Sequence, residues 1–76
     1  MAVIDIVSEV TGTVWKIEAQ VGQRLAKDDT VLVIESMKME IPLCAPEDGT
    51  LLEVLVSEAD VIQEGAVVAR LQKVGT

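Results

Sequence analysis

The sequence predicts an all-β fold, a sandwich or flattened barrel of short strands, on three observations. Val, Ile and Leu supply 26 of the 76 residues, and the 19 Val and Ile residues favour pleated structure. Turn-forming residues interrupt the chain at short intervals, at Gly12, Gly22, Pro46, Gly49 and Gly65. An internal duplication then repeats the same pattern of strand and turn. Many short strands with regular turns are typical of sandwiches and barrels.

The duplication is visible in two segments that begin 37 positions apart, Gly12-Thr13-Val14-Trp15 and Gly49-Thr50-Leu51-Leu52. The same offset matches apolar residues with apolar residues over more than twenty positions. The matched pairs are Ile17 with Val54, Ala19 with Val56, Leu25 with Ile62, Val31 with Val68, and Ile34 with Leu71. Two copies indicate a pseudo-twofold pair of strand–turn–strand units rather than a solenoid, which needs about three or more repeats.

In the first copy, three strands are expected, each bounded by turn residues. Val3–Val7 is a short apolar run near the start of the chain, and Thr13–Val21 lies between two glycines. Val31–Glu35 is a continuous apolar run after the turn-like Asp28-Asp29, which is the pattern of a buried strand. Between the last two strands, the isolated Leu25 predicts a short extended piece.

In the second copy, Met39–Ala45 ends at a proline, and Thr50–Val56 begins after a glycine. Val67–Leu71 follows another glycine, and the spacing of Ile62, equivalent to Leu25, predicts a second short extended piece. Glu58-Ala59-Asp60 is turn-like. A single amphipathic helix over residues 58–70 is the main competing interpretation of this region.

Composition and charge exclude several classes of function. A net charge of −7 repels phosphates, and Trp15 as the only aromatic residue cannot stack several bases, so nucleic-acid binding is not expected. Without histidine, and with Cys44 as the only cysteine, the chain cannot build a zinc site, a serine–histidine pair or an internal disulfide. We therefore expect no catalytic residues and no metal. The acid excess suits docking onto basic partner surfaces.

The expected setting is the cytoplasm. A lone cysteine fits a reducing compartment, and the chain shows neither a signal peptide nor an apolar stretch of the roughly 20 residues that cross a membrane. Residues 1–76 are expected to form one domain, near the lower size limit for folding without disulfides or metals.

The most specific local feature is Glu35-Ser36-Met37-Lys38-Met39-Glu40, which places one lysine between two methionines and two acidic residues. It lies between the expected strands Val31–Glu35 and Met39–Ala45, so Ser36, Met37 and Lys38 are predicted to connect a tight hairpin. Methionine is flexible and polarizable and can fit more than one protein pocket. Taken in isolation, the motif is also compatible with a surface lysine whose two neighbouring methionines fold onto the sheet.

The motif and its setting resemble the biotinyl domains of biotin-dependent carboxylases, which belong to the biotin/lipoyl attachment family. The resemblance covers residues 2–73 and rests on the Ser-Met-Lys-Met sequence, the spacing of residues 22–35, and Ala45-Pro46-Glu47-Asp48-Gly49-Thr50. It implies two antiparallel four-stranded sheets related by a quasi-twofold axis, with the lysine on an exposed hairpin turn.

The chain departs from the family pattern at three places. Asp28 and Ala59 stand where the family usually has glycine, and Ser8-Glu9-Val10-Thr11 replaces the common Ala-Pro start of the first copy. An alanine in a left-handed turn costs roughly 1 kcal/mol or forces another turn type. The "thumb" insertion of some bacterial carriers is absent.

By resemblance, Lys38 is the residue that a biotin protein ligase joins to biotin. The carboxylated biotin would then move between a biotin carboxylase and a carboxyltransferase, so the chain would be a non-catalytic carrier. The residues expected to be recognised by the ligase or by these partners are Glu35, Ser36, Met37, Met39 and Glu40.

Several alternatives stay open at this point. The lysine could carry lipoyl in a 2-oxo-acid dehydrogenase-type complex, although lipoyl acceptors in the family usually have Asp-Lys-Ala or a similar context. The chain could instead be an unmodified β-sandwich adaptor. Glu35 and Glu40 could simply be solvated strand ends, and Trp15 is interpreted as a residue packed on the sheet or as a docking contact.

Overall fold

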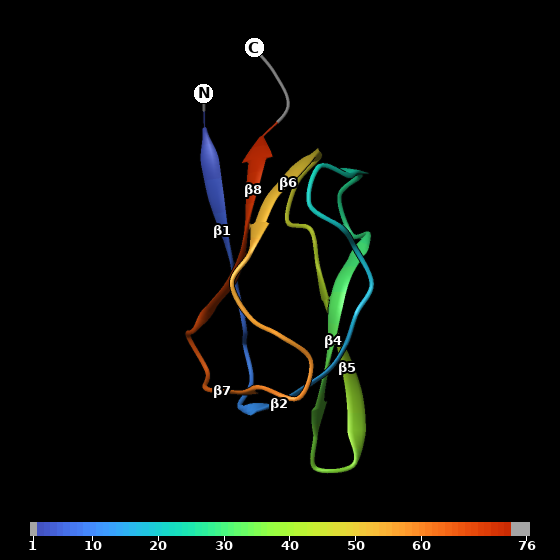
Figure 1. The fold of residues 1–76 in the computed structure, drawn as a ribbon, viewed down its shortest axis with the longest axis vertical. Coiled ribbons are helices and arrows are strands. Elements are labelled where there is room, and N and C mark those ends of the chain that lie inside the picture. Colours follow the sequence, from blue (N-terminus) through green and yellow to red (C-terminus); the bar gives the residue numbers. More distant parts are fainter. Residues whose placement is uncertain (1, 74–76) are drawn as a thin grey trace.

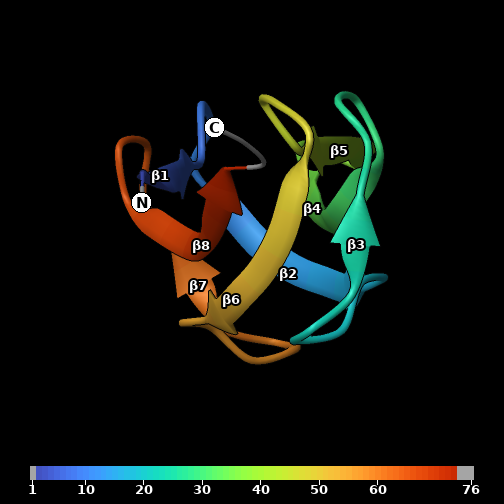
Figure 2. The same cartoon turned by 90° about the horizontal axis from the view of Figure 1, so that it is seen from above.

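Eight strands form two antiparallel four-stranded sheets that pack face to face in the computed structural model, which describes residues 2–73 (Figures 1 and 2). The predicted all-β class is therefore confirmed. The strands are β1 (Val3–Val7), β2 (Gly12–Ile17), β3 (Arg24–Leu25), β4 (Thr30–Ser36), β5 (Met39–Cys44), β6 (Gly49–Val54), β7 (Val61–Ile62) and β8 (Val67–Lys73).

The strand order confirms the quasi-twofold relation. One sheet runs β1-β8-β6-β3 and the other β5-β4-β2-β7. Adding 37 to the residue numbers of β1, β2, β3 and β4 leads to β5, β6, β7 and β8, so each sheet combines strands of both copies. Even the irregularities repeat, because the register shifts between Val14 and Lys16 in one copy and between Leu51 and Glu53 in the other.

The hydrophobic core lies between the two sheets and draws on both copies. Its completely or almost completely buried members include Val14, Leu25, Val31, Leu32, Ile34, Leu51, Val68, Ala69 and Leu71. Strands β4 and β8 contribute the most buried residues, and both are interior strands, each seven residues long. The two isolated apolar residues of the sequence, Leu25 and Ile62, are buried in the two shortest strands, β3 and β7.

Glycine is required where each copy begins its central strand. A Cβ atom on Gly12 would lie 2.5 Å from the backbone oxygen of Glu35 and 2.7 Å from Cγ2 of Ile34. Gly49, the equivalent residue, would meet the backbone of Gln72 and the side chain of Leu71 in the same way. The glycines that mark the duplication in the sequence therefore mark two equivalent close contacts, one in each sheet.

Some predicted boundaries are wrong. Strand β2 ends at Ile17 instead of Val21, because the amides of Glu18 and Ala19 both donate to the carbonyl oxygen of Val31, at 2.9 and 3.0 Å, and the chain leaves the sheet there. Strand β6 ends at Val54 in the equivalent place. The competing helix over residues 58–70 is contradicted, because this region contains β7 and the first part of β8.

The departures from the family's turn sequences leave the turns intact. Asp28 and Ala59 adopt left-handed φ angles of 76° and 77°, close to the 90° and 91° of their equivalents Gly65 and Gly22. The strained residue is thus accommodated rather than avoided. Ser8, which stands where alanine is common, is 1% exposed, and its hydroxyl donates to the carbonyl oxygen of Val10 at 2.6 Å.

Candidate functional site

The β4–β5 hairpin forms one end of the long axis of the molecule (Figure 1). The two strands are paired from Thr30 opposite Cys44 to Ser36 opposite Met39. Ser36 therefore belongs to β4 rather than to the connection, and only Met37 and Lys38 form the turn. Because Ser36 is paired with Met39, the strand register leaves Met37 and Lys38 as the two residues at the tip.

Both turn residues have left-handed backbone conformations, with φ of 52° for Met37 and 65° for Lys38. A two-residue hairpin with positive φ at both central positions is normally occupied by Asn-Gly or a similar pair. For ordinary residues this conformation costs about 1–2 kcal/mol each, so the chain accepts backbone strain at the tip. Such strain persists where the surrounding structure enforces it and is frequent at functional sites.

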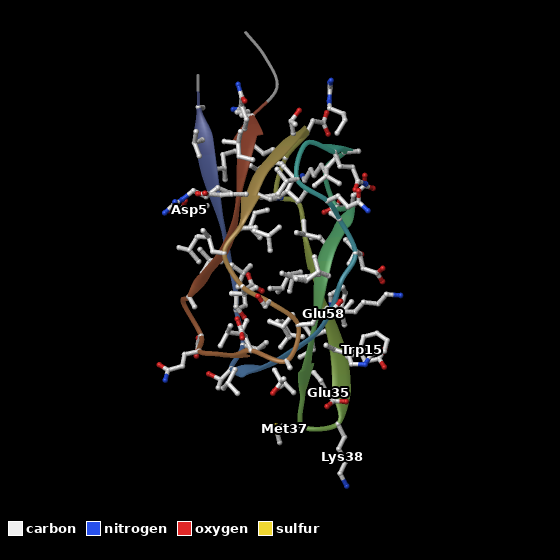
Figure 3. All side chains as sticks on the ribbon, viewed as in Figure 1. Asp5, Trp15, Glu35, Met37, Lys38 and Glu58 are labelled. Carbon is white, nitrogen blue, oxygen red and sulfur yellow. The ribbon has the colours of Figure 1, made fainter. Side chains whose placement is uncertain are left out.

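The side chains at the tip are directed into solvent. Met37 is 92% exposed and Met39 is 64% exposed, and Lys38 extends away from the body of the protein (Figure 3). Within residues 2–73, the Lys38 ammonium makes no hydrogen bond or ion pair. The predicted lysine thus extends into solvent between two exposed thioethers, and the alternative in which both methionines fold onto the sheet is not observed.

Glu35 and Glu40 face each other directly across the two strands. Like charges in this position destabilise a sheet by roughly 0.2–1 kcal/mol, so the fold gains nothing from their pairing. Strand alternation places them on the outer face of the sheet, because their neighbour Ile34 points into the core. The tip is therefore flanked by two carboxylates on one side and by Ser36 and Met39 on the other.

A hydrogen bond that was not predicted from the sequence ties the hairpin to the rest of the protein. The hydroxyl of Ser36 donates to the carbonyl oxygen of Thr11 at 2.9 Å, and the hydroxyl oxygen of Thr11 accepts from the amide of Glu64 at 3.0 Å. The duplication places a side chain that can accept a hydrogen bond at both equivalent positions, Thr11 and Asp48. In the structure, Asp48 accepts from the amide of Lys27 at 2.8 Å, as Thr11 does from Glu64. Thr11 thus links the hairpin to the connection between β7 and β8.

The remaining observations concern other kinds of site. No group of three or more potential metal ligands occurs among residues 2–73. A groove of about 520 Å³ runs between the edge strands β1 and β5, lined in part by Val7, Pro42 and Cys44, but Lys38 is not among its lining residues. The described part of the chain contains no helix long and apolar enough to span a bilayer.

Comparison with known proteins agrees with this geometry. The family described as "Biotin-requiring enzyme" matches residues 2–71. The biotin/lipoyl attachment protein of Bacillus subtilis is 38% identical over 63 residues, which are 83% of this chain and 86% of that protein. The biotinylated protein TB7.3 homolog of Mycobacterium leprae is also 38% identical, over 86% of this chain and 92% of that protein.

Similarity extends to parts of much larger enzymes. The crystal structure of the Kluyveromyces lactis urea carboxylase matches 95% of this chain with a TM-score of 0.91 and 32% identity, and the match spans 6% of that enzyme. The family match over nearly the whole chain, the two small relatives and the shared fold lead to one conclusion: the chain belongs to the biotin/lipoyl attachment family and is a biotin carrier similar to the biotinyl domains of biotin-dependent carboxylases.

Proposed function

We propose that the protein is a biotin carboxyl carrier in which biotin is joined to the amine of Lys38. The observation that carries the proposal is the position of this amine, which stands at the tip of a two-residue turn, without a partner among the described residues, between two exposed methionines. A group attached there would project beyond the sheets. The same position lets a second enzyme reach the attached group without unfolding the hairpin.

Attachment needs activation from outside the chain. A lysine side chain in water carries a proton at neutral pH, and no described residue makes a hydrogen bond or ion pair with Lys38 through which it could take that proton. The biotin protein ligase would therefore convert biotin and ATP into biotinyl-adenylate and pyrophosphate. The deprotonated amine then attacks the biotinyl carbonyl carbon, a C–N bond forms, the bond to the adenylate oxygen breaks, and AMP leaves. Two protons leave the nitrogen, one when the ammonium is deprotonated and one when the amide forms, and each goes to a base of the ligase or to water.

The residues on both sides of Lys38 would contact the ligase and the later partners. Met37 and Met39 supply mobile apolar contacts that adapt to different pockets. Glu35 and Glu40 supply carboxylates for basic groups of a partner, which accounts for a like-charged pair that the fold itself does not favour. Ser36 holds the hairpin against the body through its bond to Thr11.

When bound, biotin carries a carboxyl group from a biotin carboxylase to a carboxyltransferase. The chain itself would catalyse neither step, and its contribution is confinement, since tethering holds the group at about millimolar effective concentration near the partner sites. Support comes from the similarity of this chain to a small part of two carboxylases: 6% of the B. subtilis pyruvate carboxylase, at 35% identity, and 11% of the M. leprae biotin-dependent acyl-coenzyme A carboxylase alpha3 subunit, at 34% identity. We place this carrier, as one domain, in the cytoplasm.

The test is modification by a purified ligase. We expect the wild-type chain to gain one biotin, measured by intact mass and streptavidin binding, with the modified residue located by peptide sequencing. Lys38→Ala should stay folded and gain none, whereas Lys27→Ala, which removes an exposed lysine from the connection between β3 and β4, should be modified like the wild type. Labelling of Lys38→Ala at the wild-type level would exclude the proposed site.

Lipoylation is a second candidate, because one relative is named a biotin/lipoyl attachment protein. Incubating parallel samples with a lipoyl ligase and with a biotin ligase distinguishes the two groups by mass. The methionines on both sides of Lys38 lead us to expect biotin. Absence of any covalent group on Lys38 in cells that contain the natural ligase and partners would favour an unmodified adaptor instead.

A further inference from the structure

The quasi-twofold axis gives the protein two outer sheet faces with the same backbone geometry, so their side chains can be compared position by position. In one sheet, Lys16 of β2 lies opposite Val33 of β4, which lies opposite Pro42 of β5. In the other sheet, the equivalent row is Glu53 of β6, Arg70 of β8 and Asp5 of β1. Beside these rows, at the equivalent bulges, stand Trp15 and Leu52. We call the first the hairpin-sheet face (Trp15, Lys16, Val33 and Pro42) and the second the ion-pair face (Leu52, Glu53, Arg70 and Asp5).

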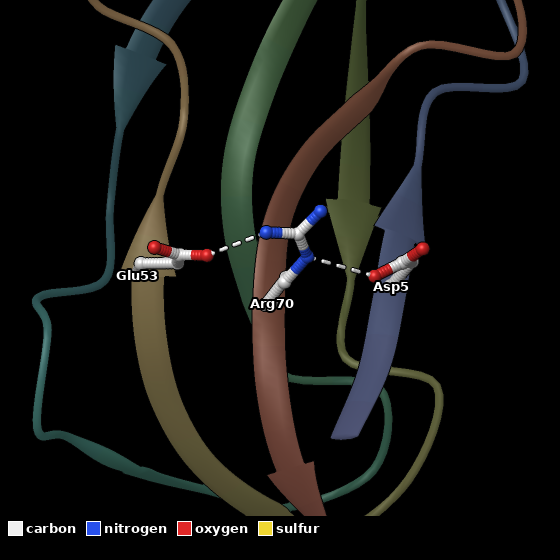
Figure 4. Close-up of polar contacts among 3 residues, drawn as sticks. All are labelled: Asp5, Glu53 and Arg70. Carbon is white, nitrogen blue, oxygen red and sulfur yellow. Dashed lines mark hydrogen bonds and ion pairs between the residues drawn. The ribbon is translucent and has the colours of Figure 1, made fainter.

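On the ion-pair face, the charged side chains pair with one another. Nη1 of Arg70 lies 2.8 Å from Oε1 of Glu53, and Nε lies 3.1 Å from Oδ1 of Asp5, so one guanidinium connects three strands (Figure 4). The hydrogen bond to Glu53, and then the bond to Asp5, raise the pKa of the Arg70 guanidinium above its ordinary value. Each charge on this row has a partner within the protein.

The hairpin-sheet face has no such chain of ion pairs: three of its four residues are apolar, and the ammonium of the fourth, Lys16, lies 3.9 Å from Oε1 of Glu18, just after the end of the same strand. Trp15 is 49% exposed, whereas Val33 is only 8% exposed although it does not belong to the core cluster. Val33 is therefore covered from the outside by its neighbours on this face. Pro42 is exposed, and as a proline it has no amide hydrogen to offer a further strand. The fold does not require a tryptophan at the bulge, because leucine occupies the equivalent position in the other sheet.

This face is continuous with the proposed attachment site. Val33 and Pro42 stand two residues before Glu35 and two residues after Glu40 on the same side of the hairpin, which corresponds to about 7 Å along each strand. Glu58 lies beside the end of β2, where its Oε2 accepts a hydrogen bond from the amide of Ile17 at 3.1 Å (Figure 3). The face therefore adjoins the carboxylates of Glu35 and Glu40 and also carries the ammonium of Lys16, so a complementary surface has an apolar centre and places its basic groups opposite the two glutamates.

We infer that the hairpin-sheet face is a docking surface for the biotin protein ligase, whose lysine or arginine side chains contact Glu35 and Glu40 while an apolar or cationic side chain covers Trp15. The inference rests on the proposed function. An enzyme that acts on the amine of Lys38 has this face directly beside its substrate, because Val33 and Pro42 continue the outer side of the hairpin that carries Glu35 and Glu40. Aromatic residues are the usual energetic centres of such interfaces, and a cation over an indole is a favourable contact.

The duplication supplies the variants for a test. Trp15→Leu installs the residue of the equivalent bulge, and the triple variant Lys16→Glu, Val33→Arg and Pro42→Asp installs the ion-pair row on the hairpin-sheet face. Both changes copy side chains that the same backbone already carries in the other sheet. Leu52→Ala on the ion-pair face is the matched control. The urea unfolding midpoint of each variant verifies folding, and sedimentation verifies whether the chain self-associates.

Biotinylation kinetics are then measured with ligase, ATP and biotin, with each protein as the varied substrate. We expect KM for the protein to rise at least about tenfold in Trp15→Leu and in the triple variant, as for loss of a central interface aromatic, with kcat within about twofold of wild type. Leu52→Ala should keep the wild-type KM. KM values unchanged in both face variants, or raised equally in Leu52→Ala, would overturn the inference, as would concentration-dependent self-association that is abolished by Trp15→Leu without a change in KM. A wild-type chain that gains no biotin would instead refute the proposed function.

Discussion

Replacing Met37 by glycine should change stability and recognition in opposite directions. Met37 has a φ of 52°, and its side chain is 92% exposed, so in the free protein it contributes strain and almost no burial. Removing the Cβ relieves about 1–2 kcal/mol of left-handed strain. Glycine also has more conformational freedom in the unfolded chain, which lowers the free energy of unfolding by about 0.4–1 kcal/mol and offsets part of this gain. The net expectation is about 0.5–1 kcal/mol of added stability.

The assay combines thermal unfolding with ligase kinetics. For a protein of this size the expected gain corresponds to an increase in Tm of about 2–8 °C. If the thioether of Met37 is a recognition contact, kcat/KM for biotinylation should fall, by about tenfold for a contact of about 1.4 kcal/mol. The more stable protein would then be the poorer substrate, because the strained residue serves the partner and not the fold.

Ala59→Gly is the matched control. Ala59 has a φ of 77° in a turn outside the β4–β5 hairpin, and its methyl group is not one of the contacts proposed for the ligase, so the same relief of strain should raise Tm without any change in biotinylation. The reverse change, Gly22→Ala at the equivalent turn, should lower Tm by strain alone, because a Cβ there meets no atom within 4 Å. A Met37→Gly variant with a lower Tm than wild type would refute the reasoning, since it would mean that the methionine packs against the protein.

Two further predictions test how the hairpin is held. Gly12→Ala should destabilise the protein by more than about 2 kcal/mol, because the new methyl group would lie 2.5 Å from the carbonyl oxygen of Glu35, and equilibrium urea unfolding measures the loss; an unchanged midpoint would contradict the close approach. Ser36→Ala removes the hydrogen bond to Thr11 and should cost about 0.5–1.5 kcal/mol while speeding amide hydrogen exchange in the hairpin. Exchange rates identical to those of the wild type would show that this bond does not hold the hairpin in place.

The sequence was informative where a residue type is tied to a local conformation. Gly12 and Gly49 made the duplication recognisable in the sequence, because only glycine fits at two equivalent contacts with the neighbouring strand. Short apolar runs between turns located β1, β4, β5 and β8 to within two residues. Boundaries failed at the end of β2, where two amides share the carbonyl oxygen of Val31, since a bulge of this kind depends on the neighbouring strand.

At the candidate site, the lysine and its methionines were identified from the sequence, but the geometry was not. A pair of φ angles of 52° and 65° on Met37 and Lys38 contradicts the preference of both residues, and it arises because the paired strands β4 and β5 leave only two residues to close the hairpin. The hydrogen bond between Ser36 and Thr11 joins residues 25 positions apart, so no local sequence pattern could predict it.

By itself, the sequence determined the all-β class, the twofold repetition and the presence of one lysine in a distinctive setting, because composition, spacing and self-similarity are properties of the chain alone. Only the tertiary structure decided which residues share an outer face and which side chains remain in solvent. The contrast between the row of Lys16, Val33 and Pro42 on one face and Arg70 between Asp5 and Glu53 on the other exists only across strands. Such a row is assembled by strand pairing, so residues far apart in the sequence acquire a common surface only when the sheets form.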